Sequence, residues 1–235
     1  MIMKRTIGIV IALMLTTHLL YAQQTLFQKI SPTIDANLNE WQPLTPVDEE
    51  YSWSYAIAKD DGYLYVAIEI KDPLLIQEVV KNGVMVNIDP KAKKNLGPAL
   101  IYPYADRIAL RSLDKSKIQS LGENFNNHLI SLCRGYMVQG FPTVKDGLLS
   151  FENTYNIKSE IKIDSSGAVQ YESAIPIASF QKLLKGDRKI SIQLAIMTPW
   201  EQMKMLAKQK RSSNTMSLGR NPYPYSTEVW LNETL

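Results

Sequence analysis

The chain has 235 residues, with 26 Lys and Arg against 23 Asp and Glu, so its net charge at pH 7 is only +3. This balance gives no electrostatic reason to expect nucleic acid or an anionic membrane surface as the main partner. Cys133 is the only cysteine and there are two histidines, which excludes an internal disulfide and limits histidine-based chemistry. The chain is long enough to bury a large core without a disulfide.

Residues 1–22 have the pattern of a secretory signal peptide. Lys4 and Arg5 precede an almost entirely apolar run over residues 7–20, and Ala22 stands where a signal peptidase would cut. The alternative, an uncleaved anchor, is less favoured because the run is shorter than the roughly 20 residues that span a bilayer. Cleavage would remove two basic residues and no acidic ones, which lowers the net charge from +3 to +1. We therefore predict a secreted or periplasmic protein without a stable membrane span.

The remaining chain, residues 23–235, has mainly the pattern of β-strands. Large side chains alternate with small ones from Tyr51 to Ala58, which predicts a strand with its large groups on one face. Residues 59–62 supply turn chemistry, and residues 63–70 form the continuous apolar run of a strand covered on both faces. Together these segments predict a β-hairpin.

Further elements are expected along the rest of the chain. In the first half they are a helix over 74–81, a strand over 83–88, a loop over 91–106, a strand over 107–113, and a strand or a short helix followed by a strand over 128–138 within the less regular stretch 114–146. In the second half they are a hairpin over 157–175, a helix over 177–185, a strand over 189–197, a polar segment over 198–226 with a helical insert near 201–211, and a last strand over 227–231.

Many short strands without an internal repeat or linker predict an all-β fold. The expected architecture is a two-sheet antiparallel β-sandwich with a few short helices in its connections, built as one domain over residues 23–235.

Several short motifs resemble one family. Residues 33–41, Thr-Ile-Asp-Ala-Asn-Leu-Asn-Glu-Trp, resemble the I-D-G-x-L-D-E-W opening of family 9 carbohydrate-binding modules and their DOMON-like relatives. Residues 60–65 and Asp72-Pro73 resemble the turn and strand end that follow in that family, and residues 171–176 resemble its Y-E-x-A-I-P strand. Pro222, Pro224 and residues 228–231 resemble its closing strand. Ala36 replaces the usual glycine of the opening and Asn39 the usual aspartate.

The resemblance implies an antiparallel sandwich and, as an expectation, carbohydrate binding without catalysis. Sugar rings stack on exposed aromatic faces, while a few polar groups fix the hydroxyls. We expect Trp41 to pack at the end of the sandwich, and Trp53 and Trp230 to lie in its core. The candidate ligand-binding residues lie in the expected loops, where they form either a ligand platform or ordinary loop packing: Trp200, Tyr223, Tyr225, Tyr102, Tyr104 and Arg107.

The sequence indicates a metal site less strongly than it indicates carbohydrate binding. Asp60, Asp61, Asp72 and Asp89 stand in turns near strand ends, where they are either calcium ligands or turn-forming residues, without EF-hand spacing. A calcium ion, if bound, would brace loops.

Two other functional hypotheses stay open. Some DOMON-like domains bind haem through Met with His or Lys, and His128 is the only histidine outside the signal segment. The second alternative is a cell-envelope interaction or scaffold domain that binds a protein partner and has no small-molecule site. An enzyme is not predicted, since no G-x-S-x-G or H-E-x-x-H motif occurs.

Overall fold

A computed structural model describes residues 26–41, 43–112, 124–209 and 220–235. The predicted signal peptide, residues 1–22, lies outside this part of the chain. No helix in the described ranges is both long and apolar enough to cross a membrane.

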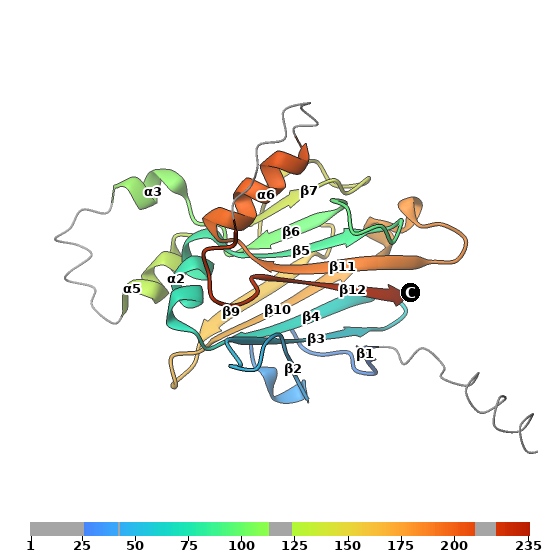
Figure 1. The fold of residues 1–235 in the computed structure, drawn as a ribbon. Helices are drawn as coiled ribbons and strands as arrows, with labels where there is room; N and C mark the ends of the chain where they lie inside the picture. Colours follow the sequence, from blue (N-terminus) through green and yellow to red (C-terminus); the bar gives the residue numbers. More distant parts are fainter. Residues whose placement is uncertain (1–25, 42, 113–123, 210–219) are drawn as a thin grey trace, which may run out of the picture.

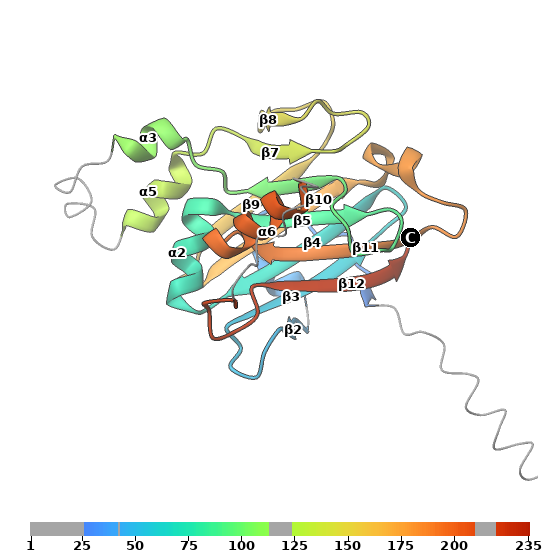
Figure 2. The same ribbon diagram turned by 45° about the horizontal axis from the view of Figure 1, so that its top comes forward.

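Two six-stranded sheets pack face to face, which confirms the predicted β-sandwich (Figures 1 and 2). The first sheet has the order β1-β3-β4-β10-β9, with β2 paired to β3. Its strands are β1 (Phe27–Gln28), β2 (Thr45–Pro46), β3 (Trp53–Lys59), β4 (Tyr63–Ile70), β9 (Lys158–Ile163) and β10 (Val169–Pro176). The second sheet has the order β12-β11-β5-β6-β7-β8. Its strands are β5 (Val84–Asp89), β6 (Ala99–Tyr102), β7 (Tyr136–Gln139), β8 (Gly147–Leu149), β11 (Lys189–Ile196) and β12 (Glu228–Thr234). All the strand pairs are antiparallel except β1 with β3.

The α-helices are α2 (Pro73–Asn82), α3 (Arg107–Arg111), α5 (Phe125–Ser131) and α6 (Pro199–Gln209). The helices α2, α3 and α5 lie at one end of the sandwich, and α6 lies on the outer face of the second sheet (Figure 1). The 3-10 helices are η2 (Leu38–Glu40), η4 (Ile177–Ser179) and η5 (Gln181–Leu183). Both views place α6 over the outer face of the second sheet (Figures 1 and 2).

The predicted hairpin of β3 and β4 is confirmed. Trp53 and Ile57 point into the core between the sheets, while Ala56 and Ala58 pack on the opposite face against Trp41. Asp60 closes the turn by accepting hydrogen bonds from the Gly62 and Tyr63 amides and the Tyr65 hydroxyl. Burial alone would raise the pKa of Asp60, but these hydrogen bonds outweigh it and hold the pKa below its ordinary value. The turn that the sequence predicts over residues 59–62 is therefore held by hydrogen bonds to the Asp60 carboxylate.

Three sequence expectations were wrong in detail. Where a strand over 107–113 was expected, Arg107–Arg111 form helix α3, because the Asp106 side chain accepts hydrogen bonds from the Ile108 and Ala109 amides and starts the helix. The expected loop over 91–106 contains β6, which pairs with β5 and β7. The expected helix over 177–185 is two separate 3-10 turns, η4 and η5. By contrast, the helical insert expected near 201–211 within the polar segment 198–226 is confirmed as α6.

Glu172 fastens the opening motif to the first sheet. Its carboxylate is fully buried and accepts hydrogen bonds from the Trp41 indole (2.6 Å) and from the backbone amides of Asp35 (2.9 Å) and Ala36 (2.6 Å). Ala36 adopts a φ of 56°, a conformation that favours glycine, which accounts for the glycine of the motif that this segment resembles. Trp41 is fully buried, so its predicted structural role is confirmed. Burial raises the pKa of Glu172 despite these three donors.

We expect Glu172→Gln to destabilise the protein by about 2 kcal/mol, because an amide nitrogen would replace an oxygen that now faces donor groups. Urea denaturation measures the change. Glu160→Gln is the matched control, since Glu160 is exposed at the position directly paired with Glu172 in β9, and it should shift stability by less than about 0.5 kcal/mol. Equal effects of the two substitutions would contradict the role given to Glu172.

Candidate functional site

The outer face of the second sheet carries a row of polar side chains. Directly paired residues of antiparallel strands share a face. The register therefore aligns Trp230 of β12, Gln193 of β11, Asn87 of β5, Ala99 of β6 and Gln139 of β7. A shorter row beside it contains Asn232, Ser191 and Asp89. Such a face, unlike the apolar inner face, offers hydrogen-bonding groups on a rigid platform.

The next row on this face is largely apolar and lies under helix α6. It contains Ala195, Met85, Ile101 and Met137, which cluster with Met205 of the helix. Helix α6 therefore covers the apolar part of the face and leaves the polar rows beside it.

Lys204 anchors α6 to the sheet. Its ammonium group donates to Glu201 of the same helix (3.1 Å) and to Glu228 of β12. The carboxylate of Glu201, which is buried, also accepts from the Thr227 hydroxyl (2.6 Å). Burial alone would lower the pKa of Lys204, but the two carboxylates outweigh it and raise the pKa. The helix is thus held by a part-buried ionic cluster at one edge of the sheet.

The loop between β5 and β6, residues 90–98, is held by two buried side chains. Asp89 accepts hydrogen bonds from the backbone amides of Lys91 (2.9 Å), Lys93 (2.8 Å) and Asn95 (3.0 Å). Asn87 donates to the Asn95 carbonyl (3.1 Å) and accepts from the Gly97 amide (2.8 Å).

Gly97 is required where this loop returns to the sheet. An added Cβ at this position would lie 2.1 Å from the Ile88 carbonyl oxygen, too close for any side chain. The loop is therefore a fixed wall.

A single chain of hydrogen bonds connects this loop with helix α6 across the sheet. Asn87 donates to the Gln193 carbonyl (3.2 Å), Gln193 donates to Glu228, and Glu228 accepts from Lys204. Gln193 is 3 % exposed, so its amide depends on these partners for its hydrogen bonds. The two walls of the polar region are consequently fixed by one network.

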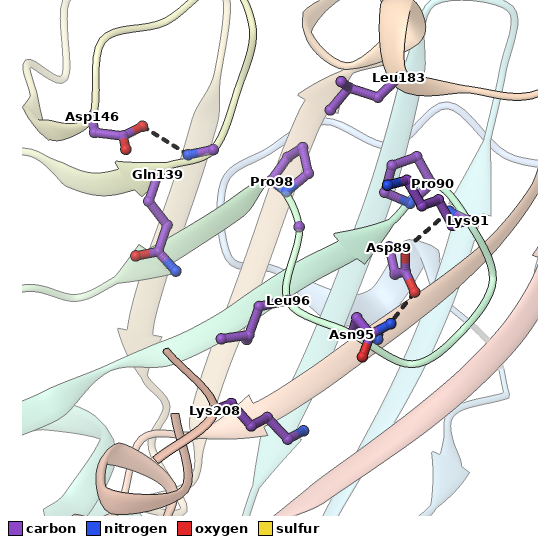
Figure 3. Close-up of a pocket in the computed structure, with 12 residues that line it drawn as sticks. Asp89, Pro90, Lys91, Asn95, Leu96, Pro98, Gln139, Asp146, Leu183 and Lys208 are labelled. Carbon is purple, nitrogen blue, oxygen red and sulfur yellow. Dashed lines mark hydrogen bonds between the residues drawn. The ribbon is translucent and has the colours of Figure 1, made fainter. Parts of the chain in front are cut away.

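Between these walls lies a cavity of about 730 Å³ (Figure 3). It is lined by Asp89, Pro90, Lys91, Asn95, Leu96, Gly97, Pro98, Gln139, Gly140, Asp146, Leu183 and Lys208. These residues come from the loop 90–98, strand β7 and the turn after it, η5 and α6. Its volume is in the range of pockets that hold small ligands.

The polar groups of the cavity differ in how far they are already used. Asp89 is engaged by three backbone amides, and Asp146 accepts from the Gly140 amide (2.7 Å). The side-chain amides of Asn95 and Gln139 make no hydrogen bond with any described residue. These two amides are therefore the neutral groups available to a ligand.

A second cavity of about 580 Å³ adjoins the first and shares Gln139 with it. Its lining is more apolar and includes Tyr104, Met137, Met197 and Met205. It lies along the apolar row beneath α6.

The six sequence-predicted ligand residues do not form one platform. Tyr102 is the last residue of β6 and is 6 % exposed, with its ring packed edge-on against Tyr136 and Phe151. Its expected place in a ligand-binding loop was wrong, because pairing with β5 draws it into the core. Tyr104 is half-buried and lines the second cavity. Arg107 begins α3, and its side chain lies outside the described part of the structure.

Tyr223 and Tyr225 are tied to helix α2. The Tyr223 hydroxyl donates to Glu78 (3.0 Å) and the Tyr225 hydroxyl donates to Asp72, while both rings pack against the main core. Burial, together with Glu78, raises the pKa of Tyr223 to about 12. Trp200 is half-buried in the first turn of α6 and does not belong to a loop as expected. None of these three residues lines the first cavity.

Trp230, expected in the core, lies half-buried on the outer face. Leu231 points inward, so strand alternation places Trp230 on the opposite side. Its indole donates to Glu228 (3.3 Å), and the Lys208 ammonium lies 5.5 Å from its ring centre. The alternation of residues 228–231 is the sequence signal that would have shown this. Trp53 is fully buried, as expected.

The four aspartates proposed for calcium serve separate turns. Asp60 closes the β3–β4 hairpin, Asp72 accepts from the Leu74 and Leu75 amides at the start of α2, and Asp89 holds the loop 90–98. Asp61 is exposed next to Asp60. Across the described ranges, no group of three or more His, Cys, Asp or Glu side chains is placed to hold a metal ion. The turn-forming explanation therefore accounts for Asp60, Asp72 and Asp89.

The haem alternative finds no support around His128. This histidine lies in α5 and is half-buried, and it lines neither of the two cavities described above. The methionines gather instead beneath α6.

The chain is similar to two solved structures of a family 9 carbohydrate-binding module from Caldicellulosiruptor kristjanssonii, one in complex with glucose and one with cellotriose. Both have a TM-score of 0.37, with 11 % and 10 % identity. Each match covers 72 % of this chain, and 76 % and 74 % of the module. No protein-family model and no curated protein matches the sequence. The structural matches come from the family that the sequence motifs resemble.

Removing the Lys204 ammonium tests the anchor of α6. We expect Lys204→Met to cost about 2 to 3 kcal/mol, somewhat less than for a fully buried pair because 21 % of the lysine side chain is exposed. In a double-mutant cycle, Glu228→Gln should cost less in the Lys204→Met background than in the wild type. Lys162→Met, at an exposed position of β9, is the control and should be nearly neutral. Additive costs would contradict the anchor.

The anchor should also depend on pH. Burial alone would raise the pKa of Glu228, but Lys204 outweighs it and lowers the pKa below the ordinary 4.5. Stability from a lowered carboxyl pKa is complete above the ordinary value and is lost as the pH falls through the lowered one. The Tm difference between wild type and Lys204→Met should therefore be largest near about pH 7 and shrink toward about pH 3. A constant difference across this range would contradict the assignment.

Proposed function

We propose that the protein is an exported, non-catalytic module that binds a carbohydrate in the cavity between loop 90–98 and helix α6. The observation that carries the proposal is this cavity of about 730 Å³ on a rigid sheet face, with the unpaired amides of Asn95 and Gln139 in its lining. Amide groups donate and accept hydrogen bonds at once, as the hydroxyl groups of a sugar require. The motifs that resemble family 9 modules point to the same ligand class.

Preorganisation supports the proposal. The floor is a β-sheet, one wall is fixed by Asp89 and Asn87, and the other is anchored through Lys204. Ordering these groups is therefore a cost of folding, and little entropy remains to be lost on binding. The apolar surfaces of Pro90, Leu96, Pro98 and Leu183 can contact the C–H faces of a sugar ring.

The proposal includes the organisation of the chain. Residues 1–22 act as a signal peptide, and residues 23–235 form one domain that works in the periplasm or outside the cell. The cavity contains no pair of unengaged carboxylates in its described lining, which fits binding better than glycoside hydrolysis.

Binding to a panel of soluble and immobilised glycans tests the proposal. We expect at least one glycan to bind, and Gln139→Ala and Asn95→Ala each to weaken its affinity about tenfold, since each removes hydrogen bonds to hydroxyl groups. Tyr223→Phe is the control because it removes a hydroxyl that contacts Glu78 outside the cavity, and it should leave the affinity unchanged.

The outcomes separate the possible sites. Loss of binding in Trp200→Ala or Tyr225→Phe, with full binding in the cavity variants, would move the site to the aromatic residues near α2 and α6. No binding to any glycan by the folded protein would overturn the proposal and favour an envelope interaction domain.

A further inference from the structure

The cavity contains two lysines without a carboxylate partner. Lys91 on the loop 90–98 and Lys208 on α6 both line it, and neither forms an ion pair with any described residue (Figure 3). Lys208 is placed by the ring of Trp230, whose centre lies 5.5 Å from its ammonium nitrogen. The two cations come from separate walls, so a ligand in the cavity can meet both.

The two carboxylates of the cavity differ in how far they are engaged: Asp89 is buried and bonded through both oxygens, whereas Asp146 is exposed and bonded through one. Both oxygens of Asp89 accept backbone amides, and Asp146 accepts the Gly140 amide. Glu228, close enough to Lys208 for the lysine charge to lower its pKa further, is bonded to Lys204 and Gln193. Lys91 and Lys208 are therefore the cations of the lining that are left without an ion-pair partner among the described residues, and the free oxygen of Asp146 is the one carboxylate oxygen of the lining without a hydrogen bond from a described residue.

Further exposed lysines are close in sequence to residues of the lining. Lys93 and Lys94 lie on the loop 90–98, Lys145 lies beside Asp146, and Lys182 lies beside Leu183. The whole chain carries a net charge of only +3, so this gathering reflects local placement more than overall composition. A concave surface with one predominant sign of charge attracts ligands of the opposite sign.

We propose that the ligand of this cavity is an acidic glycan, a sugar chain bearing carboxylate or sulfate groups, and that Lys91 and Lys208 contact its anionic groups. This inference rests on the proposed function and narrows it from carbohydrate to anionic carbohydrate. Charge-assisted hydrogen bonds from the two ammonium groups supply the selectivity over neutral sugars.

Matched polymers test the inference. Affinity of the purified protein is measured for polygalacturonate and its carboxyl-reduced neutral form, and for dextran sulfate and dextran, at low and high salt. We expect at least one acidic polymer to bind about tenfold more tightly than its neutral counterpart, with affinity falling as salt rises. Which pair shows the preference distinguishes a carboxylate from a sulfate ligand.

Substitutions locate the charge recognition. Lys91→Gln and Lys208→Gln should each reduce the preference for the acidic polymer several-fold while leaving the affinity for the neutral one nearly unchanged. Lys158→Gln on β9 removes the same charge from the edge strand of the first sheet, which does not line the cavity, and should preserve the preference.

The remaining outcomes would overturn either this inference alone or the proposed function as well. Equal affinity for acidic and neutral polymers, with sensitivity to Gln139→Ala, would overturn this inference and leave the proposed function standing. An equal loss in Lys158→Gln would also overturn it, as nonspecific charge attraction. Equally tight binding of polyglutamate would overturn the sugar part of both proposals, and no binding of any polymer would overturn both.

Discussion

The buried amide of Gln193 imposes the constraint on which the outer face depends. A side chain that is 3 % exposed must have both its donor and its acceptor satisfied, or the protein pays a desolvation penalty. Asn87 satisfies the carbonyl and Glu228 satisfies the amide nitrogen. Asn87 then extends the network to the loop 90–98, and Glu228 extends it to α6 through Lys204. One requirement for hydrogen bonding thus positions both walls of the cavity.

This network also explains why the outer face is divided. Helix α6 packs its apolar side on the row that contains Met85 and Met137, and its lysines reach the polar edge. Most of the polar row beyond the helix is buried and holds the loop 90–98, while Gln139 at its β7 end lines the cavity. The candidate site is consequently built on strands and a braced loop, which hold side chains more accurately than mobile loops do.

The aromatic residues near the C-terminus have a structural task in this arrangement. The hydroxyls of Tyr223 and Tyr225 bond to carboxylates of α2, and their rings extend the core at the end of the sandwich. The lysines, by contrast, contribute to the candidate site. Lysines from separate segments line one cavity, although the chain as a whole is nearly neutral. The distribution of groups over the surface, more than their number, gives the molecule its candidate binding face.

The sequence by itself determined the sandwich class, the β3–β4 hairpin, the structural role of Trp41 and a helix over residues 74–81, because alternation, turn residues and caps act over a few neighbouring positions. Only the tertiary structure decided the site. Asn87, Gln193 and Trp230 are far apart in sequence and meet through strand register, which no local pattern specifies. Tyr102 was expected in a loop, but β6 pairs with strands on both sides and makes it a strand residue. Asp89 was a candidate metal ligand, but its carboxylate accepts hydrogen bonds from three backbone amides. Long-range pairing decides which polar groups are satisfied and which remain free for a ligand.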